Sequence, residues 1–364
     1  MAAFSFLGDQ ICHGKTIVIH KTFKACVLTK VNQPLELMEL QIPQAFYSGQ
    51  VLVKLKKAGL CRSQLMEARG HRGKDKYLPH LLGHEGVGYV IQVAPDVTKV
   101  KPGDRVILGW LKGSGLDSGG CTLTTTYGEK VNAGPVTTFS EYSLISENRL
   151  TVCPDDITDE VAVLLGCALP TGAGIVLNQV KPNHYHDVLL IGLGGIGLSA
   201  LLMLKHLKPK TITVIDANPD KIKLAQKLGV DQAYVLRDET QAEITSKFPT
   251  GFDYAIECAG QSRSIELAFE LLNNTGTCIF ASHPPNGEKI QLDPHALICG
   301  KKIIGSWGGN SNPDTDLAKI GRILQNMSLP DDLFVSHRFS LDEINDAFDA
   351  LERGDVIRVM IEFN

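Results

Sequence analysis

The pattern of apolar and polar positions divides the chain into a β-rich first half and a second half in which strands and helices alternate. Over residues 24–142, short apolar segments separated by turns predict strands, among them 51–57 and 86–93. Later segments such as 252–260, a strand followed by a turn, alternate with helical segments such as 264–272, which predicts a parallel sheet. The sequence therefore predicts an α/β protein that combines a β barrel or sandwich with a doubly wound sheet.

One stretch of the second half has the complete pattern of a dinucleotide-binding unit. The apolar run 188–191 is typical of a buried strand, and it is followed at once by three glycines in G-x-G-x-x-G spacing: Gly192, Gly194 and Gly197. In this pattern the first glycine permits a tight turn, the second lets a pyrophosphate approach the backbone, and the third allows close helix packing. The N–H groups at the start of the following helix, at Gly195 and Ile196, then face the phosphates.

The next strand of this unit predicts which dinucleotide binds. The run 211–215 ends in Asp216, at about the 20-residue offset expected for an acid that holds the 2′-hydroxyl of the adenosine ribose. A 2′-phosphate would be repelled by this charge, and Ala217 and Asn218 offer no cation in compensation. We therefore expect NAD rather than NADP. Lys221 is within reach of the ribose, although a lysine near a helix start is commonly just solvated.

Composition and charge exclude several classes of protein. A chain of 364 residues exceeds the usual size of a single core, so two domains are expected, and 43% hydrophobic with 21% charged residues is typical of a globular protein. The net charge of -4 argues against nucleic acid as the main partner. No apolar run has membrane-spanning length, and residues 1–7 lack the pattern of a signal peptide. We expect a cytoplasmic protein.

The cysteines raise the question of a metal site. There are nine, scattered along the chain, which does not suggest a disulfide framework, and burial is the expectation for Cys258 and Cys278 in strand-like runs. Cys61 directly follows a predicted strand, His84 lies between turn glycines, and Cys167 opens a predicted helix. Two thiolates and one imidazole suit zinc and leave a fourth position for water or substrate. Because no C-x-x-C pair is present, the spacing alone favours burial without a metal.

Several motifs together resemble the medium-chain zinc alcohol dehydrogenases. They are Gly-Leu-Cys-Arg-Ser at Cys61, Gly-His-Glu-Gly at His84, Lys-Pro-Gly-Asp-Arg-Val, Gly-Cys at Cys167 with Thr171-Gly, and the Gly192 loop. Their order and spacing match that family over nearly the whole chain. The resemblance implies a GroES-like catalytic domain over 1–168, completed by 307–364, and an NAD-binding Rossmann domain over 169–306.

The resemblance also assigns roles to residues of the first half. Cys61, His84 and Cys167 match the three ligands of one catalytic zinc per subunit, and Glu85 matches a buried acid that lies near this metal. Ser63 resembles the hydroxyl that hydrogen-bonds the oxygen of the substrate. These five residues form the expected metal and catalytic site.

Further positions match contacts to the cofactor and the substrate. Arg62 and Arg358 match basic residues that contact the cofactor pyrophosphate, although Arg358 without the family context would be read as a surface arginine. Thr171 belongs with the cofactor-binding residues. Trp110 matches an aromatic wall of the substrate pocket that would favour slim alcohols, with a core tryptophan as the alternative. Trp307 is either a neighbour of the nicotinamide or a structural residue.

The chain departs from the family where many relatives carry a lobe with four cysteines for a second, structural zinc. The corresponding segment, 112–121, contains only Cys121, and one thiol cannot build such a site. We therefore expect one zinc per subunit. The glycine- and serine-rich loop 113–120 is expected to be a mobile surface segment.

Two substitutions near the expected metal also depart from the family. Met66 replaces a histidine of the usual proton relay and cannot accept a proton, so water, His71 or His80 must serve instead, although either histidine is more commonly a surface residue. Gln64 stands where relatives often have an aspartate that supports the ligand histidine, so we expect His84 to be less basic.

The predicted activity is reversible oxidation of a small-molecule alcohol to an aldehyde or ketone, with zinc lowering the pKa of the hydroxyl and hydride passing to NAD. A polyol, sugar or amino-alcohol dehydrogenase is one alternative, but such relatives often have a carboxylate in place of Cys167. Two further alternatives are a zinc-free quinone or enone reductase and a catalytically silent NAD-binding scaffold. Both are disfavoured by the presence of the complete set Cys61, Ser63, His84 and Cys167. Relatives are typically homodimers or homotetramers, and no nucleic acid or membrane partner is expected.

Overall fold

The chain forms two compact units in a computed structural model that describes residues 10–12, 15–17, 21–327, 329–330, 333–354, 356 and 358–363. The first unit consists of the chain up to Cys167 together with the chain from Asn312 onward, and the second unit is Ala168–Ser311. The expectation about residues 1–7 falls outside the described residues. In the described part of the chain, every helix is too short or too polar to span a membrane.

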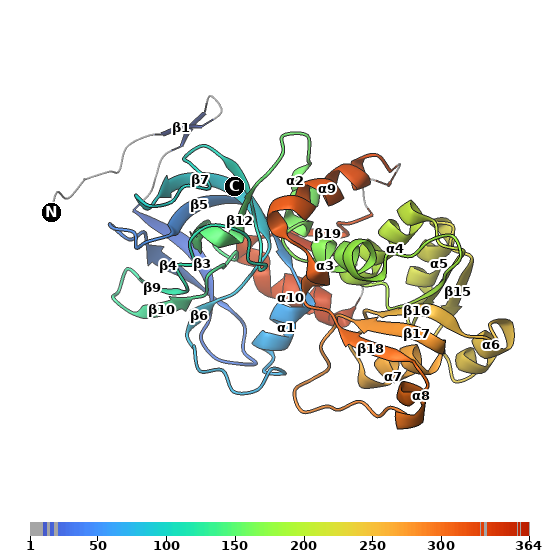
Figure 1. Ribbon diagram of the computed structural model, residues 1–364. Coiled ribbons are helices and arrows are strands. Elements are labelled where there is room, and N and C mark those ends of the chain that lie inside the picture. Colours follow the sequence, from blue (N-terminus) through green and yellow to red (C-terminus); the bar gives the residue numbers. More distant parts are fainter. Residues whose placement is uncertain are drawn as a thin grey trace. The chain divides into compact units, whose positions relative to one another are not determined.

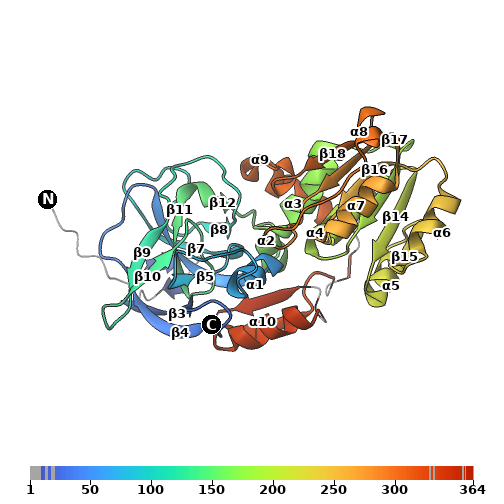
Figure 2. The same ribbon diagram turned by 90° about the horizontal axis from the view of Figure 1, so that it is seen from below.

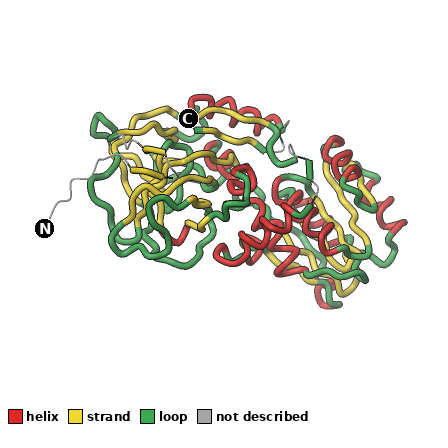
Figure 3. Tube along the Cα trace, turned by 90° about the horizontal axis from the view of Figure 1, so that it is seen from above, coloured by secondary structure: helices red, strands yellow, loops and turns green. Residues whose placement is uncertain are grey.

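The first unit is built mainly from strands (Figures 1 and 3). A five-stranded sheet has the order β4 (Glu36–Gln41), β3 (Thr22–Leu28), β6 (His80–Leu81), β10 (Lys130–Ala133) and β9 (Cys121–Thr124). A second sheet has the order β12 (Leu150–Val152), β8 (Arg105–Leu108), β7 (Gly86–Val93), β5 (Gln50–Leu60), β20 (Val359–Glu362) and β19 (His337–Ser340), with β11 (Tyr142–Ser146) also on β5. β1 (Gln10–Cys12) pairs with β2 (Lys15–Ile17). The helices are α1 (Arg62–Ala68), α2 (Asp159–Leu164), α9 (Pro313–Gln325) and α10 (Ile344–Arg353).

The last part of the chain completes this unit. β20 pairs antiparallel with β5, with Val359 opposite Leu60. Beside it lies α10 (Figure 2), which buries Phe348 against the same core as Leu60. α10 is preceded by a 3₁₀-helix at Leu341–Glu343, which is capped by Ser340 and Glu343. The C-terminal segment is therefore part of the core of the first unit.

The loop 113–120, predicted to be a mobile surface segment, is largely exposed, but two acids distant in the sequence bind its backbone. Glu147 is fully buried, and its carboxylate accepts backbone hydrogen bonds from Leu116 at 2.7 Å, Thr98 at 2.7 Å and Lys99 at 2.6 Å. Asp314 accepts a further bond from the Ser114 N–H at 2.6 Å. Hydrogen bonds to charged acceptors contribute roughly 1.5–3 kcal/mol each, so these two acids hold the loop in place.

The second unit is a parallel six-stranded sheet flanked by helices (Figure 3). Its strand order is β15 (Gln232–Val235), β14 (Thr211–Asp216), β13 (Asp187–Ile191), β16 (Phe252–Glu257), β17 (Leu272–Phe280) and β18 (Lys302–Gly305). Its helices are α3 (Ala168–Gly174), which continues into a π-helical turn at Ile175–Val180, α4 (Gly195–Leu207), α5 (Pro219–Lys227), α6 (Thr240–Lys247), α7 (Ser262–Glu270) and α8 (Pro294–Ile298). Figure 1 shows α4 and α5 on one side of the strands and α7 on the other. This order, 3-2-1-4-5-6, is that of the doubly wound dinucleotide-binding fold, which confirms the predicted fold class.

Candidate active site

Three side chains from distant parts of the first unit meet at one point. Cys61 directly follows β5 and precedes α1, and His84 lies between β6 and β7. Cys167 follows α2 and is the last residue of the first of the two chain segments that form this unit. The Nε2 atom of His84 lies 3.2 Å from the sulfur of Cys167, and the two sulfurs are 3.9 Å apart. All three potential ligand atoms lie within 4.8 Å of one another. The structure thus brings together the three residues that the sequence named as a ligand set.

The chemistry of this group fits a zinc ion. The neighbouring thiol of Cys167 donates to Cys61 and lowers the pKa of Cys61 well below its usual value, so that a thiolate is available as a ligand. Because it makes this donation and is buried, Cys167 has a pKa well above the usual value. Two sulfurs and one imidazole nitrogen are the soft donors that zinc prefers. The residues present therefore fit the metal that the sequence predicts.

A buried ion pair lies directly beside this group. Glu85 and Arg358 are 0% and 6% exposed, and the Nη2 atom of Arg358 donates to Oε2 of Glu85 at 3.0 Å. Burial raises the pKa of Glu85 to about 7, although Arg358 acts in the opposite direction. Room for this carboxyl depends on Gly59, since a Cβ there would lie 2.6 Å from Oε1 of Glu85. Arg358 is thus a core residue, and its contact with a pyrophosphate stays a prediction.

Helix α1 carries the hydroxyl expected to meet the substrate. The Oγ atom of Ser63 is shielded from solvent and has no hydrogen-bond partner in the described part of the chain. A buried hydroxyl without a partner is costly unless a ligand supplies one. Arg62, at the first position of the helix, is exposed, and Met66 is half-buried.

The two histidines considered as replacements in the proton relay have other surroundings. In His80, Nδ1 lies 2.9 Å from the carbonyl oxygen of Leu81 and Nε2 lies 2.8 Å from Oδ2 of Asp75. Glu67 adds a second carboxylate to this group. Both ring nitrogens of His80 already have partners, and His71 is exposed. Neither arrangement supports a role in proton transfer from Ser63.

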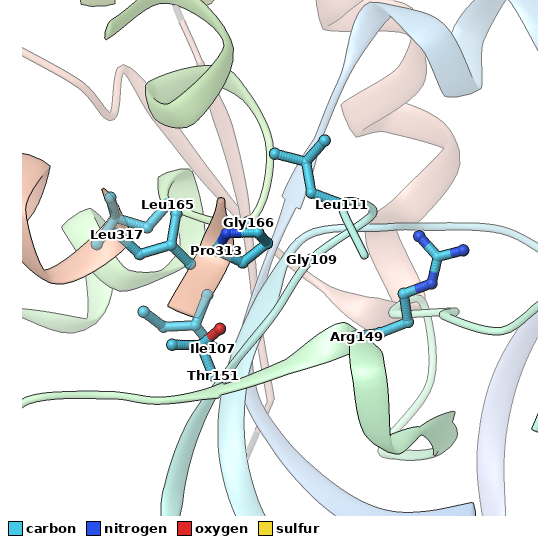
Figure 4. A pocket seen from close by; sticks show the side chains of 9 residues that line it. All are labelled: Ile107, Gly109, Leu111, Arg149, Thr151, Leu165, Gly166, Pro313 and Leu317. Carbon is cyan, nitrogen blue, oxygen red and sulfur yellow. The ribbon is translucent and has the colours of Figure 1, made fainter. Parts of the chain in front are cut away.

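Trp110 is half-buried at the end of β8 and lies next to the segment that holds Cys167. The backbone N–H of Trp110 donates to the carbonyl oxygen of Gly166 at 3.3 Å, and the backbone carbonyl of Trp110 accepts from Nη1 of Arg149. Close by is a cavity of about 10 Å³, lined mainly by apolar side chains including Leu165 and Leu317, with Arg149 at one side (Figure 4). This volume holds at most about one water molecule, so the cavity is not the substrate pocket.

In the second unit, the glycine loop has the geometry that the sequence predicts. Gly192 has φ of 89°, which favours glycine, and a Cβ at Gly197 would lie 1.8 Å from the carbonyl oxygen of Gly192. A Cβ at Gly194 would meet nothing within 4 Å, so the space in front of this residue is open. Gly195 and Ile196 begin α4, and their N–H groups are at its positive end.

Other predicted cofactor residues lie in the same unit. Asp216 ends β14, and its Oδ2 accepts from the N–H of Leu193 in the glycine loop at 2.6 Å. This contact fixes the carboxylate beside the loop. Lys221 is half-buried in α5, Thr171 is buried in α3, and Trp307 is 72% exposed. The roles of these residues toward a cofactor stay predictions.

The sequence analysis did not identify Glu257. It is fully buried at the end of β16, and its Oε1 accepts from the N–H groups of Ala259 and Gly260 and from the hydroxyl of Ser264. Burial raises the pKa of this carboxyl despite these bonds. Glu257 pairs with Ile191, directly before the glycine loop. An acid at the carboxyl end of a central parallel strand was the signal that could have identified it.

Comparison with known proteins is consistent with both units. The family model described as an alcohol dehydrogenase GroES-like domain matches residues 47–155, and the one described as a zinc-binding dehydrogenase matches residues 195–323. The chain is similar to the S-(hydroxymethyl)glutathione dehydrogenase of Escherichia coli strain UTI89, with 29% identity over 368 residues that cover 93% of this chain and 99% of that protein.

Two solved structures resemble the chain over nearly its full length. One is an alcohol dehydrogenase zinc-binding domain protein from Burkholderia ambifaria, with a TM-score of 0.86 and 25% identity, covering 94% of this chain and 99% of that chain. The other is a benzyl alcohol dehydrogenase from Acinetobacter calcoaceticus, with a TM-score of 0.84 and 26% identity, covering 95% of this chain and 100% of that chain.

The glycine loop allows a matched test of its geometry. We expect Gly197→Ala to destabilise the protein by about 2 kcal/mol or more, because the added methyl group collides with the carbonyl of Gly192. Gly194→Ala meets no atom and should change stability by less than about 0.5 kcal/mol, while its methyl group weakens dinucleotide binding. Urea unfolding and nucleotide titration measure the two effects. Equal destabilisation by both substitutions would contradict this geometry.

Proposed function

Because the chain belongs to the medium-chain zinc-containing alcohol dehydrogenases, we propose that it interconverts an alcohol and its aldehyde or ketone with NAD. The observation that carries this proposal is the meeting of Cys61, His84 and Cys167 at one point. The first unit is then the catalytic domain, and the second unit binds NAD.

The proposed ligands of one zinc ion are Cys61, His84 and Cys167, with Glu85 nearby in the core. When bound, zinc supplies the Lewis acidity that lowers the pKa of an alcohol and polarises a carbonyl. Glu85 does not act as a further ligand in this proposal, since the ligand atoms that lie within 4.8 Å of one another at this point are those of Cys61, His84 and Cys167. The Glu85–Arg358 pair is instead a fixed, buried ion pair directly after His84 in the chain.

Ser63 provides the contact to the reacting oxygen. Its hydroxyl, without a partner among the described residues, accepts the proton of a substrate alcohol and returns it in the reverse direction. Since Met66 offers no acceptor one helical turn later, the proton leaves Ser63 through water.

The proposed NAD site combines the glycine loop with the residues around it. The N–H groups of Gly195 and Ile196 at the start of α4 hold the pyrophosphate, and Asp216 holds the ribose with Lys221 nearby. Thr171 in α3 completes the predicted set within the second unit, whereas Arg62 and Arg358 belong to the first unit and their contacts with the pyrophosphate stay predictions. NAD accepts or supplies the hydride.

The relatives suggest which alcohols to test first. One relative is an S-(hydroxymethyl)glutathione dehydrogenase and one resembling structure is a benzyl alcohol dehydrogenase, so both substrates are candidates for this chain. Trp110, next to Gly166 and Cys167, is proposed as a wall of the substrate pocket. A large indole at this position favours slim or flat alcohols.

The cellular location follows from the same ligands. The proposed zinc site needs Cys61 and Cys167 in the reduced form, because a thiolate is the ligand. We therefore propose the cytoplasm, where thiols stay reduced.

The activity is tested by NADH formation with primary, secondary, aromatic and polyol alcohols and with S-(hydroxymethyl)glutathione. We expect turnover that is lost on chelation and restored by zinc. Cys61→Ala should lose both zinc and turnover while remaining folded, because one of three ligands is gone. Cys121→Ala is the control, since this thiol lies outside the ligand group, and it should keep about one zinc per subunit in metal analysis. Full activity of Cys61→Ala would refute the proposal.

The choice of cofactor follows from Asp216. We expect NAD to be preferred over NADP by about tenfold or more in kcat/KM, because the carboxylate repels a 2′-phosphate. Asp216→Asn keeps an acceptor for the Leu193 N–H but removes the charge, and it should narrow this preference. Kinetics with both cofactors measure the ratio. Equal use of NADP by the unaltered protein would exclude this role.

We also propose a homodimer, or a homotetramer built from such dimers, joined through β18. This strand is at the end of the sheet order, and Ile298, Ile304 and Trp307 around it are 82%, 45% and 72% exposed. An exposed apolar edge strand favours pairing with a second copy of the chain.

Light scattering tests this interface. Ile304→Lys should shift the particle toward the mass of a single chain, because it places a charge where two edges would meet. Leu236→Lys is the control, since Leu236 is similarly exposed but follows β15 at the other edge of the sheet. A monomeric unaltered protein, or equal dissociation by both variants, would contradict the proposed interface.

A further inference from the structure

Gln64 contacts both Cys61 and His84. It is the third residue of α1, and its Oε1 accepts from the backbone N–H of Cys61 at 2.9 Å. Its Nε2 lies against Nδ1 of His84. The side chain is only 1% exposed, so there is little surface through which solvent could replace either contact. One amide thus faces two residues of the proposed zinc site.

These contacts match one tautomer of His84. An amide has one acceptor end and one donor end. With its oxygen on the N–H of Cys61, its NH₂ group faces Nδ1, which must then carry a lone pair. In a neutral ring the proton is therefore on Nε2, and this atom lies 3.2 Å from the sulfur of Cys167, which can accept it. The three contacts, at Cys61 N–H, His84 Nδ1 and His84 Nε2, each then pair a donor with an acceptor.

The same contacts conflict with zinc binding through Nε2. A histidine that binds a metal through Nε2 carries its proton on Nδ1. The N–H of Cys61 and the Nδ1–H of His84 are then two donors, and the single oxygen of Gln64 faces only one of them. Rotating the amide by 180° exchanges its oxygen and its NH₂ group. The oxygen then accepts from His84 Nδ1–H, but the NH₂ group faces the N–H of Cys61, so one pair of facing donors remains. A buried pair of facing donors costs free energy.

We propose that Gln64 is a positioning residue that holds His84 in the tautomer that does not bind zinc. Zinc loading therefore breaks one of two buried contacts, and the protein holds zinc less tightly than a carboxylate at this position would allow. This inference rests on the proposed function, because it requires His84 to be a zinc ligand.

The decisive variant is Gln64→Glu, which has the same length and two acceptor ends. One oxygen accepts from Cys61 N–H and the other from His84 Nδ1–H, so both donors are matched when zinc is bound. We expect zinc release from the full-length protein to a chelator to be roughly 10–100-fold slower than for the unaltered protein. A release rate within about twofold of the unaltered protein would overturn the proposal.

Gln64→Met separates this effect from ordinary support of His84. Methionine has similar length and offers neither contact, so it removes the bonds that favour the other tautomer. We expect zinc to be retained at least as long as in the unaltered protein. Faster release from Gln64→Met would show instead that Gln64 supports His84 as a simple acceptor, and the proposal would be wrong.

The tautomer of His84 is measured directly from the ¹⁵N resonances of the histidine rings in zinc-free protein. This measurement also tests whether the slower zinc release of Gln64→Glu comes only from the added negative charge. The chain has 11 histidines, and a His84→Asn variant assigns the signal. We expect the proton of His84 on Nε2 in the unaltered protein and on Nδ1 in Gln64→Glu. A proton on Nδ1 in both would overturn the proposal. An unaltered protein that takes up no zinc would refute the proposed function instead, which the metal analysis shows separately.

Discussion

The proposed zinc site depends on the register of three neighbouring antiparallel strands. β5 lies between β20 and β7, with Leu60 opposite Val359 and Ala58 opposite Gly86. The residues at these strand ends are Arg358, Cys61 and Glu85, which the register places side by side. A shift of one residue in either pairing would turn these side chains to the opposite face. The sheet therefore positions Cys61 and the Glu85–Arg358 ion pair. It also positions His84, which directly precedes Glu85 in the chain.

The buried ion pair is tolerated because the surrounding backbone makes room for it. Gly59 has no side chain where the carboxyl group of Glu85 lies, and Gly166 leaves room for the Cβ of Glu85. Arg358, directly before β20, reaches this carboxyl. Breaking such a pair leaves an uncompensated buried charge, which costs about 3–5 kcal/mol. The C-terminal strand is thus tied to the site by charge as well as by sheet pairing.

Local signals in the sequence predicted much of this fold. The alternation and turn glycines predicted β7 with the observed bounds and a strand at the position of β16, and the spacing of Gly192, Gly194 and Gly197 predicted the loop before α4. These features depend on neighbours in the sequence, so a single segment contains the necessary information. The ligand set was named only with help from the family resemblance, because the contact of His84 with Cys167 joins residues 83 positions apart.

The contacts of the loop 113–120 show why other features were not predictable. Residues 113–120 have the composition of a flexible linker, and their order comes from Glu147 and Asp314, which lie far away in the sequence. Nothing in the loop itself indicates these acceptors. In many relatives the corresponding lobe holds a structural zinc, whereas here carboxylates bind backbone N–H groups. Both solutions satisfy a segment that has little apolar surface to bury.

Gln64 illustrates a conflict between local folding and metal chemistry. Cys61 begins α1, so its N–H is among the donors that a helix leaves without an internal partner, and Gln or Glu at the third position satisfies it. The helix start therefore accepts either residue, since each provides one oxygen. The ring of His84 distinguishes them, because it requires a second acceptor when Nε2 binds a metal. Gln64 thus meets the requirement of the helix in full and that of the proposed zinc site only in part.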